Sequence, residues 1–203
     1  MTLQPSQDII FFGDSLTAGY GLPAAASFPA LIQAKLDAAG LPYRTFNYGV
    51  SGETSAGGRQ RLPGVLVRHP APAAFVLALG ANDGLRGIPA RETAANLRAM
   101  LQAVHQASPP TQRVLCGLSV PFDLSAFGVP GLGRYAQEFG ALFPDLAAAE
   151  GVAFVPSLLA GVLGRSELNL PDRVHPNAAG QQRLAETVWT VLAPLLSRAV
   201  VNS

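Results

Sequence analysis

The stretch IIFFGDSLTAGYG, residues 9–21, decides how the fold is interpreted, because a run of apolar residues stops abruptly at a Gly-Asp-Ser triplet. Consecutive apolar residues are typical of a strand that is covered on both faces. Gly, Asp and Ser are typical of a tight turn or of the start of a helix. Either the triplet is only a turn, or the strand holds the hydroxyl of Ser15 at a fixed point in space.

Outward from this stretch, short apolar runs alternate with helical patterns. The predicted strands are residues 8–12, 43–48, 73–80, 112–118 and 152–155. The predicted helices are residues 28–39, 54–68, 90–106, 134–149 and a last segment with Leu184, Val188, Val191, Leu192 and Leu195. The clearest period is that of Leu97, Met100, Leu101 and Val104, which recur as on one face of a helix. Such alternation requires crossover connections and predicts a three-layer α/β/α sandwich with a parallel sheet of about five strands.

The composition is that of a globular chain. Of the 203 residues, 49% are hydrophobic and 13% are charged, which is not typical of a disordered protein. The length suits one domain with a sizeable core, so we expect residues 1–203 to form a single domain. The formal net charge is +1 without any run of Lys and Arg, and we predict no nucleic-acid partner. Cys116 lies in an apolar run and is predicted to be a core residue.

No targeting or membrane-spanning segment is evident in the sequence. No apolar stretch approaches the roughly 20 residues that cross a bilayer, so we predict no membrane span. The first residues, MTLQPSQ, lack the basic and apolar regions of a signal peptide. As written, the chain is expected to be cytoplasmic.

Polar residues suited to catalysis follow several of the predicted strands. In parallel sheets, ligands bind beyond the carboxyl ends of the strands. Each candidate has a simpler interpretation as a turn, a helix cap or a surface residue. The candidates are Ser15 after the first strand, Gly52 in GVSGETSAGG, Asn82 in LGANDGLRG, and Asp172 and His175 in PDRVHPN.

Taken together, these residues supply the parts of a nucleophilic serine site. A serine hydroxyl needs a base to accept its proton and donors to hold the oxyanion that its attack creates. His175 can act as the base, and Asp172 can fix the other ring nitrogen. The backbone N–H groups of Ser15 and Gly52 and the side-chain amide of Asn82 can form the oxyanion hole. The Gly-x-Ser-x-Gly elbow of the α/β-hydrolases is absent, since Leu16 and Thr17 follow the serine.

The chain resembles the SGNH, or GDSL, hydrolase superfamily. FFGDSLTAGYG, GVSGETSAGG, LGANDGLRG and DRVHPN are similar to its four sequence blocks, and they occur in the family's order over residues 10 to 177. ANDGLRG and SGETS resemble most closely the bacterial thioesterase I/protease I/lysophospholipase L1 and arylesterase branch.

The resemblance implies Ser15 as the nucleophile, Asp172 and His175 as its partners, and an oxyanion hole of Ser15, Gly52 and Asn82. It also implies a flavodoxin-like sheet with strand order 2-1-3-4-5 and no metal or organic cofactor. Relatives in this branch are often periplasmic or secreted, which conflicts with the missing signal sequence.

The expected activity is that of a serine esterase on small-molecule aryl and short-to-medium acyl esters, and on thioesters. The loop VPFDLSAFGVPGLG, residues 120–133, is apolar for a connection, so it either covers the core or binds the acyl chain. In the second case its contacts are expected from Phe122, Leu124, Phe127 and Val129.

Two other functions are considered, and the oligomeric state is left open. One is a carbohydrate acetylesterase of the same superfamily. The other is a non-catalytic flavodoxin-like module that binds a flavin or another anion. Such a module would need no Asp172 and His175 pair, and that pair therefore favours the enzyme.

Overall fold

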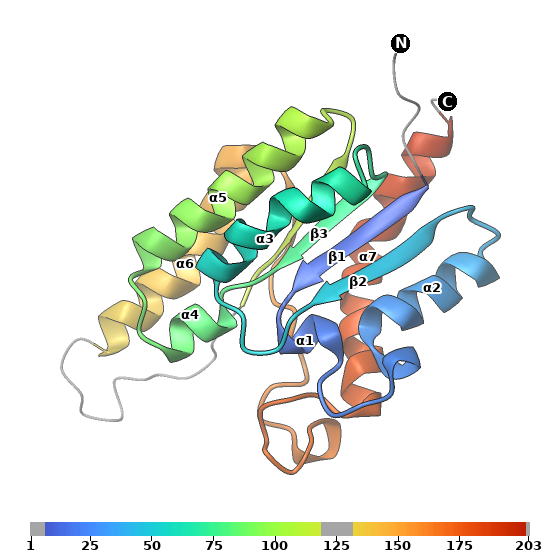
Figure 1. Ribbon diagram of the computed structural model, residues 1–203. Coiled ribbons are helices and arrows are strands. Elements are labelled where there is room, and N and C mark those ends of the chain that lie inside the picture. Colours follow the sequence, from blue (N-terminus) through green and yellow to red (C-terminus); the bar gives the residue numbers. More distant parts are fainter. Residues whose placement is uncertain (1–6, 119–131, 202–203) are drawn as a thin grey trace.

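The computed structural model describes residues 7–118 and 132–201 and shows three layers around a parallel sheet (Figure 1). The sheet is five-stranded, in the order β2-β1-β3-β4-β5, and every pair of neighbours is parallel. The strands are β1 (Asp8–Gly13), β2 (Arg44–Gly49), β3 (Ala74–Ala78), β4 (Gln112–Cys116) and β5 (Ala153–Val155). The predicted three-layer sandwich and the strand order 2-1-3-4-5 are confirmed.

Helices cover both faces of the sheet (Figure 1). One face is covered by α3 (Ser55–Arg68), α5 (Ala90–Ala107) and α6 (Leu132–Glu150), and the other by α2 (Phe28–Ala38) and α7 (Ala178–Val201). The apolar run of β1 is divided between these layers: Ile9 and Phe11 pack in the core of α2 and α7, and Ile10 and Phe12 pack in the core of α3, α5 and α6. A strand covered on both faces has no polar side, which explains the unbroken apolar run.

The helical period is confirmed where the sequence shows it most clearly. Leu97, Met100, Leu101 and Val104 are fully buried against the sheet, and burial of each such side chain stabilises the fold by about 1.5–3 kcal/mol. Cys116 is also buried, and burial raises the pKa of its thiol to about 12. It is a core residue, as predicted.

The structure differs from the prediction mainly at the ends of strands. The strand predicted over 73–80 ends at Ala78, because Gly80 adopts φ +121 and a short helix, α4 (Ala81–Leu85), follows. The triplet after β1 likewise leads into a short helix, α1 (Ser15–Ala18). Helices this short contain too few residues to show a hydrophobic period. Two short 3-10 helices, η1 (Ala24–Ala26) and η3 (Ser166–Leu168), were also not predicted.

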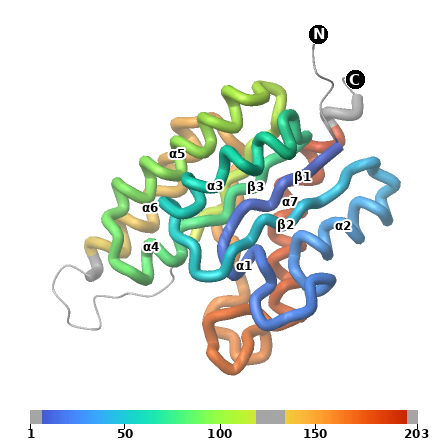
Figure 2. The backbone as a smooth tube through the Cα atoms, in the orientation of Figure 1, coloured from blue at the N-terminus to red at the C-terminus, as the bar shows by residue number. Residues whose placement is uncertain are grey.

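The carboxyl ends of the strands meet at one end of the sheet, where α1 and α4 lie (Figure 1). Figure 2 shows the segment that follows β5 returning to this end beside the segment that follows β1. No helix in the described ranges is both long and apolar enough to cross a membrane. Phe122, Leu124, Phe127 and Val129, predicted to bind the acyl chain, lie outside the described residues, and their role stays a prediction.

Candidate active site

Ser15 is held at the junction of β1 and α1 by close packing around the Gly-Asp-Ser triplet. A Cβ atom at Gly13 would overlap the side chain of Thr17 and the carbonyl of Ala78, so only glycine fits between these elements. Asp14 caps α1 by accepting a hydrogen bond from the N–H of Leu16 at 3.0 Å. The packing of β1 at Gly13 and the cap of α1 by Asp14 therefore fix the position from which the Ser15 side chain extends.

Residues from the two ends of the chain meet at this junction. Nε2 of His175 lies 3.1 Å from Oγ of Ser15, and Nδ1 of His175 lies 2.8 Å from Oδ2 of Asp172. Both distances are within hydrogen-bonding range. The structure thus brings together Ser15, His175 and Asp172 in the order that sequence analysis predicted.

The loop that carries His175 is folded around the carboxylate of Asp172. Oδ1 of Asp172 accepts hydrogen bonds from the N–H of Val174 at 2.9 Å and of His175 at 3.0 Å. Arg173, which lies between Asp172 and Val174 in the chain, adopts φ +60, which is unusual for a residue with a side chain. The N–H of Leu170 donates to the carbonyl of His175 at 2.7 Å and closes the loop. The turn therefore holds the carboxylate and the imidazole together.

These hydrogen bonds set the protonation of the pair. The backbone and side-chain hydrogen bonds from His175, with that from Val174, lower the pKa of Asp172 to about 2. Asp172 is therefore a carboxylate at neutral pH, and its Oδ2 accepts a hydrogen bond from Nδ1–H of His175. In the neutral imidazole, this leaves the lone pair on Nε2 directed at Ser15.

Asn82 is hydrogen-bonded to the chain neighbours of the two other predicted oxyanion donors. Nδ2 of Asn82 donates to the carbonyl of Glu53 at 3.0 Å and lies 3.4 Å from Oδ2 of Asp14. Glu53 follows Gly52 and Asp14 precedes Ser15, so Asn82 contacts the neighbours of both other donors. Gly52 has φ +78, a conformation that favours glycine.

The helix that carries Asn82 is held in place by a buried carboxylate. Asp83, the next residue in α4, is fully buried and accepts hydrogen bonds from the N–H and Oγ of Ser55, at 2.8 and 2.5 Å. Oγ1 of Thr93 donates to the same carboxylate at 3.2 Å. These bonds connect α4 to α3 and α5, and they fix the helix that presents Asn82.

Known proteins share extended sequence similarity with this chain. The sequence pattern of the GDSL-like lipase/acylhydrolase family matches residues 11–183. The chain belongs to this family. It is 38% identical to the esterase TesA of Pseudomonas aeruginosa over 94% of this chain and 90% of that protein. It is 32% identical to thioesterase 1/protease 1/lysophospholipase L1 of Escherichia coli over 93% of this chain and 85% of that protein.

Among solved structures, the GDSL-like fold of this chain matches that of the psychrotrophic esterase EstA from Pseudoalteromonas sp., in a structure inhibited by monoethylphosphonate. The TM-score is 0.83 at 28% identity, over 95% of this chain and 100% of that chain. The resemblance seen in the four sequence blocks is confirmed. Within residues 7–118 and 132–201, no group of three or more His, Cys, Asp and Glu side chains could hold a metal ion.

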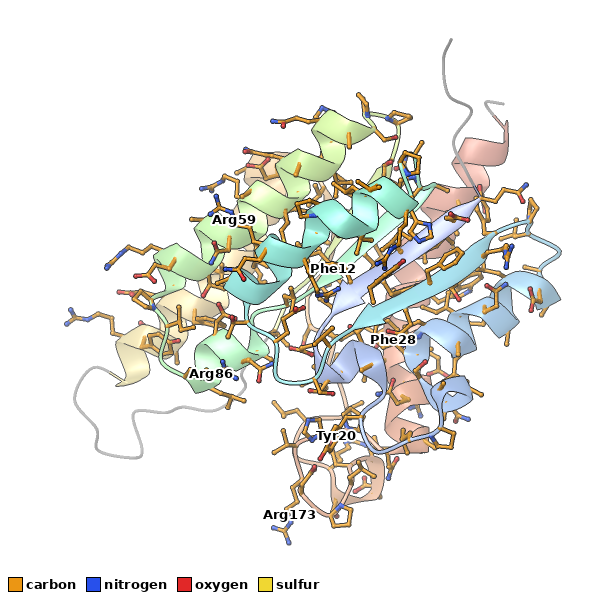
Figure 3. The ribbon with its side chains drawn as sticks, viewed as in Figure 1. Phe12, Tyr20, Phe28, Arg59, Arg86 and Arg173 are labelled. Atoms are coloured by element: carbon orange, nitrogen blue, oxygen red, sulfur yellow. The ribbon has the colours of Figure 1, made fainter. Side chains whose placement is uncertain are left out.

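Sequence analysis missed several residues of this GDSL-like site. Tyr20 lies against the imidazole of His175, with ring centroids 4.4 Å apart, and Nη2 of Arg86 donates to the carbonyl of Gly52 at 2.9 Å. Figure 3 shows both residues at the end of the sheet that holds the site. Both residues lie inside the motifs quoted above. The groups that they contact, His175 and Gly52, come from other loops, so spacing along the chain does not reveal the contacts.

Asp14 is also a titratable group of the site. Its side chain is almost fully buried, and this burial raises the pKa of its carboxyl to about 6, against the opposing effect of the hydrogen bond from Leu16. A carboxyl with this pKa changes its charge in the range in which many hydrolases are assayed.

Asp14 is expected to make the protein less stable as the pH rises. The folded state retains the proton up to about pH 6, whereas the unfolded chain loses it near 3.8, so the contribution to stability is lost between these values. From about pH 5 to about pH 7.5 this loss amounts to about 1 kcal/mol. Asp14→Asn removes this titration. Between the same two pH values, the free energy of unfolding measured in urea should therefore decrease by about 1 kcal/mol less in Asp14→Asn than in the wild-type protein. An identical pH dependence in both proteins would contradict the assignment.

Proposed function

We propose that this GDSL-like hydrolase is a serine esterase that transfers an acyl group from an ester or thioester to water. The proposal is supported above all by the continuous relay from Oγ of Ser15 through the ring of His175 to Oδ2 of Asp172, with contacts of 3.1 and 2.8 Å. A non-catalytic binding module would have no use for this arrangement.

In the first half of the reaction, Oγ of Ser15 attacks the substrate carbonyl while Nε2 of His175 accepts the hydroxyl proton. The imidazolium that forms is stabilised by the carboxylate of Asp172. The carbonyl oxygen becomes an oxyanion and accepts hydrogen bonds from the N–H groups of Ser15 and Gly52 and from Nδ2 of Asn82. The bond to the leaving group then breaks, and His175 returns its proton to the departing alcohol or thiol.

In the second half, water replaces the leaving group. His175 accepts a proton from water as its oxygen attacks the acyl-enzyme, and the same donors hold the second oxyanion. Collapse of this intermediate breaks the bond to Oγ of Ser15, which recovers the proton from His175. The acid is released, and the serine site is restored without any other reactant.

Exposed apolar side chains around the site favour substrates with an apolar acyl or aryl group. Large hydrophobic side chains are exposed at Tyr20, Val50, Leu85 and Val174. Each lies within five residues of a proposed catalytic or oxyanion-hole residue. The names of the relatives, esterase and thioesterase, support ester and thioester substrates. Within these classes we propose aryl and short-to-medium acyl groups.

A substrate panel tests this proposal. The protein is assayed on p-nitrophenyl esters of increasing acyl length, on an acyl-CoA thioester and on acetylated xylan. We expect kcat/KM to be highest on p-nitrophenyl esters of short-to-medium chains, with measurable thioester cleavage. Preference for acetylated xylan would instead indicate a carbohydrate acetylesterase. Absence of all hydrolysis, together with binding of a flavin, would indicate a binding module.

Asn82→Ala is expected to lower kcat by about 10²–10³-fold with little change in KM, which is the usual cost of one oxyanion donor. Asn82→Asp keeps the shape but places a carboxylate beside the developing charge, so its loss should be larger. Both variants are measured on p-nitrophenyl butyrate, and their fold is checked by circular dichroism. An unchanged kcat in Asn82→Ala would remove this residue from the oxyanion hole.

A further inference from the structure

We propose that Arg61 is a positioning residue for the oxyanion hole, which it orders from α3 without touching the serine or the histidine. The inference rests on the proposed esterase function and adds to it a residue outside the four sequence blocks. It also gives a role to Glu53, whose side chain is used by no step of the reaction above.

Arg61 joins three segments of backbone that lead into the site. Its Nε lies 2.7 and 2.9 Å from the two carboxylate oxygens of Glu53, and its Nη2 lies 2.5 Å from Oε2. The same Nη2 donates to the carbonyls of Tyr48 at 2.7 Å and Gly13 at 3.2 Å. Gly13 and Tyr48 stand at the ends of β1 and β2, and Glu53 lies in the loop that follows β2. One guanidinium therefore fixes all three segments.

The guanidinium is itself held rigidly. Its central carbon lies 3.8 Å from the centroid of the Phe12 ring, which lies between α3 and β1 (Figure 3). The side chain of Glu53 is only 8% exposed and that of Arg61 is 24% exposed. A planar cation stacked on an aromatic ring, with donors matched to a carboxylate, loses little further freedom when it binds. Lysine has neither the plane nor the fork and could not make these bonds together.

Glu53 transmits this order to two of the three proposed oxyanion donors. Its carbonyl accepts the hydrogen bond from Nδ2 of Asn82 at 3.0 Å, and its N–H belongs to the peptide that follows Gly52. The carbonyl of Gly52, in the same peptide as the N–H of Glu53, accepts a hydrogen bond from Nη2 of Arg86. Donors aimed in advance at the developing charge are what makes an oxyanion hole effective. Movement of Glu53 would displace Gly52 and Asn82 together.

The ion pair of Arg61 and Glu53 also has an electrostatic effect. Without Arg61, the carboxylate of Glu53 would be left largely buried and unpaired, which is costly. Its uncompensated negative charge, close to the proposed site of an oxyanion, would oppose the reaction. Both effects act on the transition state more than on binding of a neutral ester, so they should lower kcat and leave KM nearly unchanged.

The test compares Arg61→Lys with Arg59→Lys, a matched change on the same helix. Arg59 is exposed, and its Nη1 reaches Asn96 at 3.3 Å rather than the loop (Figure 3). The concentration of active sites is titrated to the end point with a p-nitrophenyl phosphonate, so that unfolded protein does not enter kcat. We expect kcat on p-nitrophenyl butyrate to fall by about 10–100-fold in Arg61→Lys, and to stay within about twofold in Arg59→Lys, which removes only an exposed contact.

The route of the effect is tested in the background of Asn82→Ala. If Arg61 acts through the oxyanion hole, Arg61→Lys should cause a clearly smaller loss there than in the wild-type protein. Glu53→Gln, which removes the charge and keeps the shape, is the second variant should Arg61→Lys fail to fold, and its kcat should fall in the same direction. An unchanged kcat per titrated site, or an equal loss in both backgrounds, would overturn the inference. Failure of the esterase proposal would look different, because the phosphonate would not label Ser15 in any variant.

Discussion

Ser15→Ala is expected to lower kcat for p-nitrophenyl butyrate by at least about 10⁴-fold, because no acyl-enzyme can form without its hydroxyl. A small residual rate should remain, since the oxyanion donors still stabilise direct attack by water. The fold should persist, because the position of Ser15 is set by the backbone packing of Gly13 and by the cap that Asp14 provides.

The comparison needs a serine that lies outside the site. Ser197 is exposed on α7 and its hydroxyl donates only to the carbonyl of Ala193, so Ser197→Ala should hydrolyse the ester at the wild-type rate. Thermal unfolding of the three proteins shows whether each is folded. Turnover by Ser15→Ala at anything near the wild-type rate would refute the assignment of the nucleophile.

His175→Ala should cause a loss of similar size, at least about 10⁴-fold in kcat, because the Ser15 hydroxyl then has no base at 3.1 Å. The His175 side chain is 22% exposed, so a small base can reach the space that the ring leaves. Added imidazole should therefore restore part of the activity of His175→Ala and none of that of Ser15→Ala.

His105→Ala is the matched control, because His105 is exposed near the end of α5. Its kcat should equal that of the wild-type protein, with or without imidazole. If His175→Ala retained wild-type activity, the relay from Ser15 to Asp172 would be without function. If imidazole stimulated both His175→Ala and Ser15→Ala equally, it would be acting in solution and not in the site.

Two carboxylates flank the proposed base, and their surroundings suit them to different tasks. Asp172 is exposed but accepts several hydrogen bonds, which lower its pKa to about 2 and keep it charged. Asp14 is buried, and desolvation raises its pKa to about 6. A permanent charge is what stabilises an imidazolium throughout the reaction. Asp172 is therefore the proposed catalytic partner of His175, and Asp14 serves as the cap of α1.

The fold was predictable where burial imposes a period or an unbroken run on the sequence. The run Ile9–Phe12 and the period of Leu97, Met100, Leu101 and Val104 reflect surfaces that must face the core. The ends of strands were less predictable, because they depend on local conformation, such as φ +121 at Gly80. The short helix α1 depends on the cap that Asp14 provides, and α4 depends on buried hydrogen bonds from α3 and α5.

Of the candidate site, the sequence predicted the residues proposed to carry out the chemistry, and it missed those proposed to position them. Ser15, Asn82 and His175 could be selected because acyl transfer needs a hydroxyl, a neutral donor and a base. Arg61 is eight residues from Glu53 in the chain. Its proposed role depends on contacts with the ring of Phe12 on β1 and with carbonyls at the ends of β1 and β2. Those contacts exist only after the sheet has formed, so no pattern along the chain predicts them.

Labelling of the serine tests the central claim most directly. The folded protein is incubated with a p-nitrophenyl phosphonate, which forms a stable tetrahedral adduct with an activated serine, and is then digested and analysed by mass spectrometry. Release of one p-nitrophenol per chain, with the phosphonyl group on Ser15 and none in His175→Ala over the same time, is the predicted result. An adduct on another residue, or labelling of Ser15 at the same rate without His175, would contradict the account.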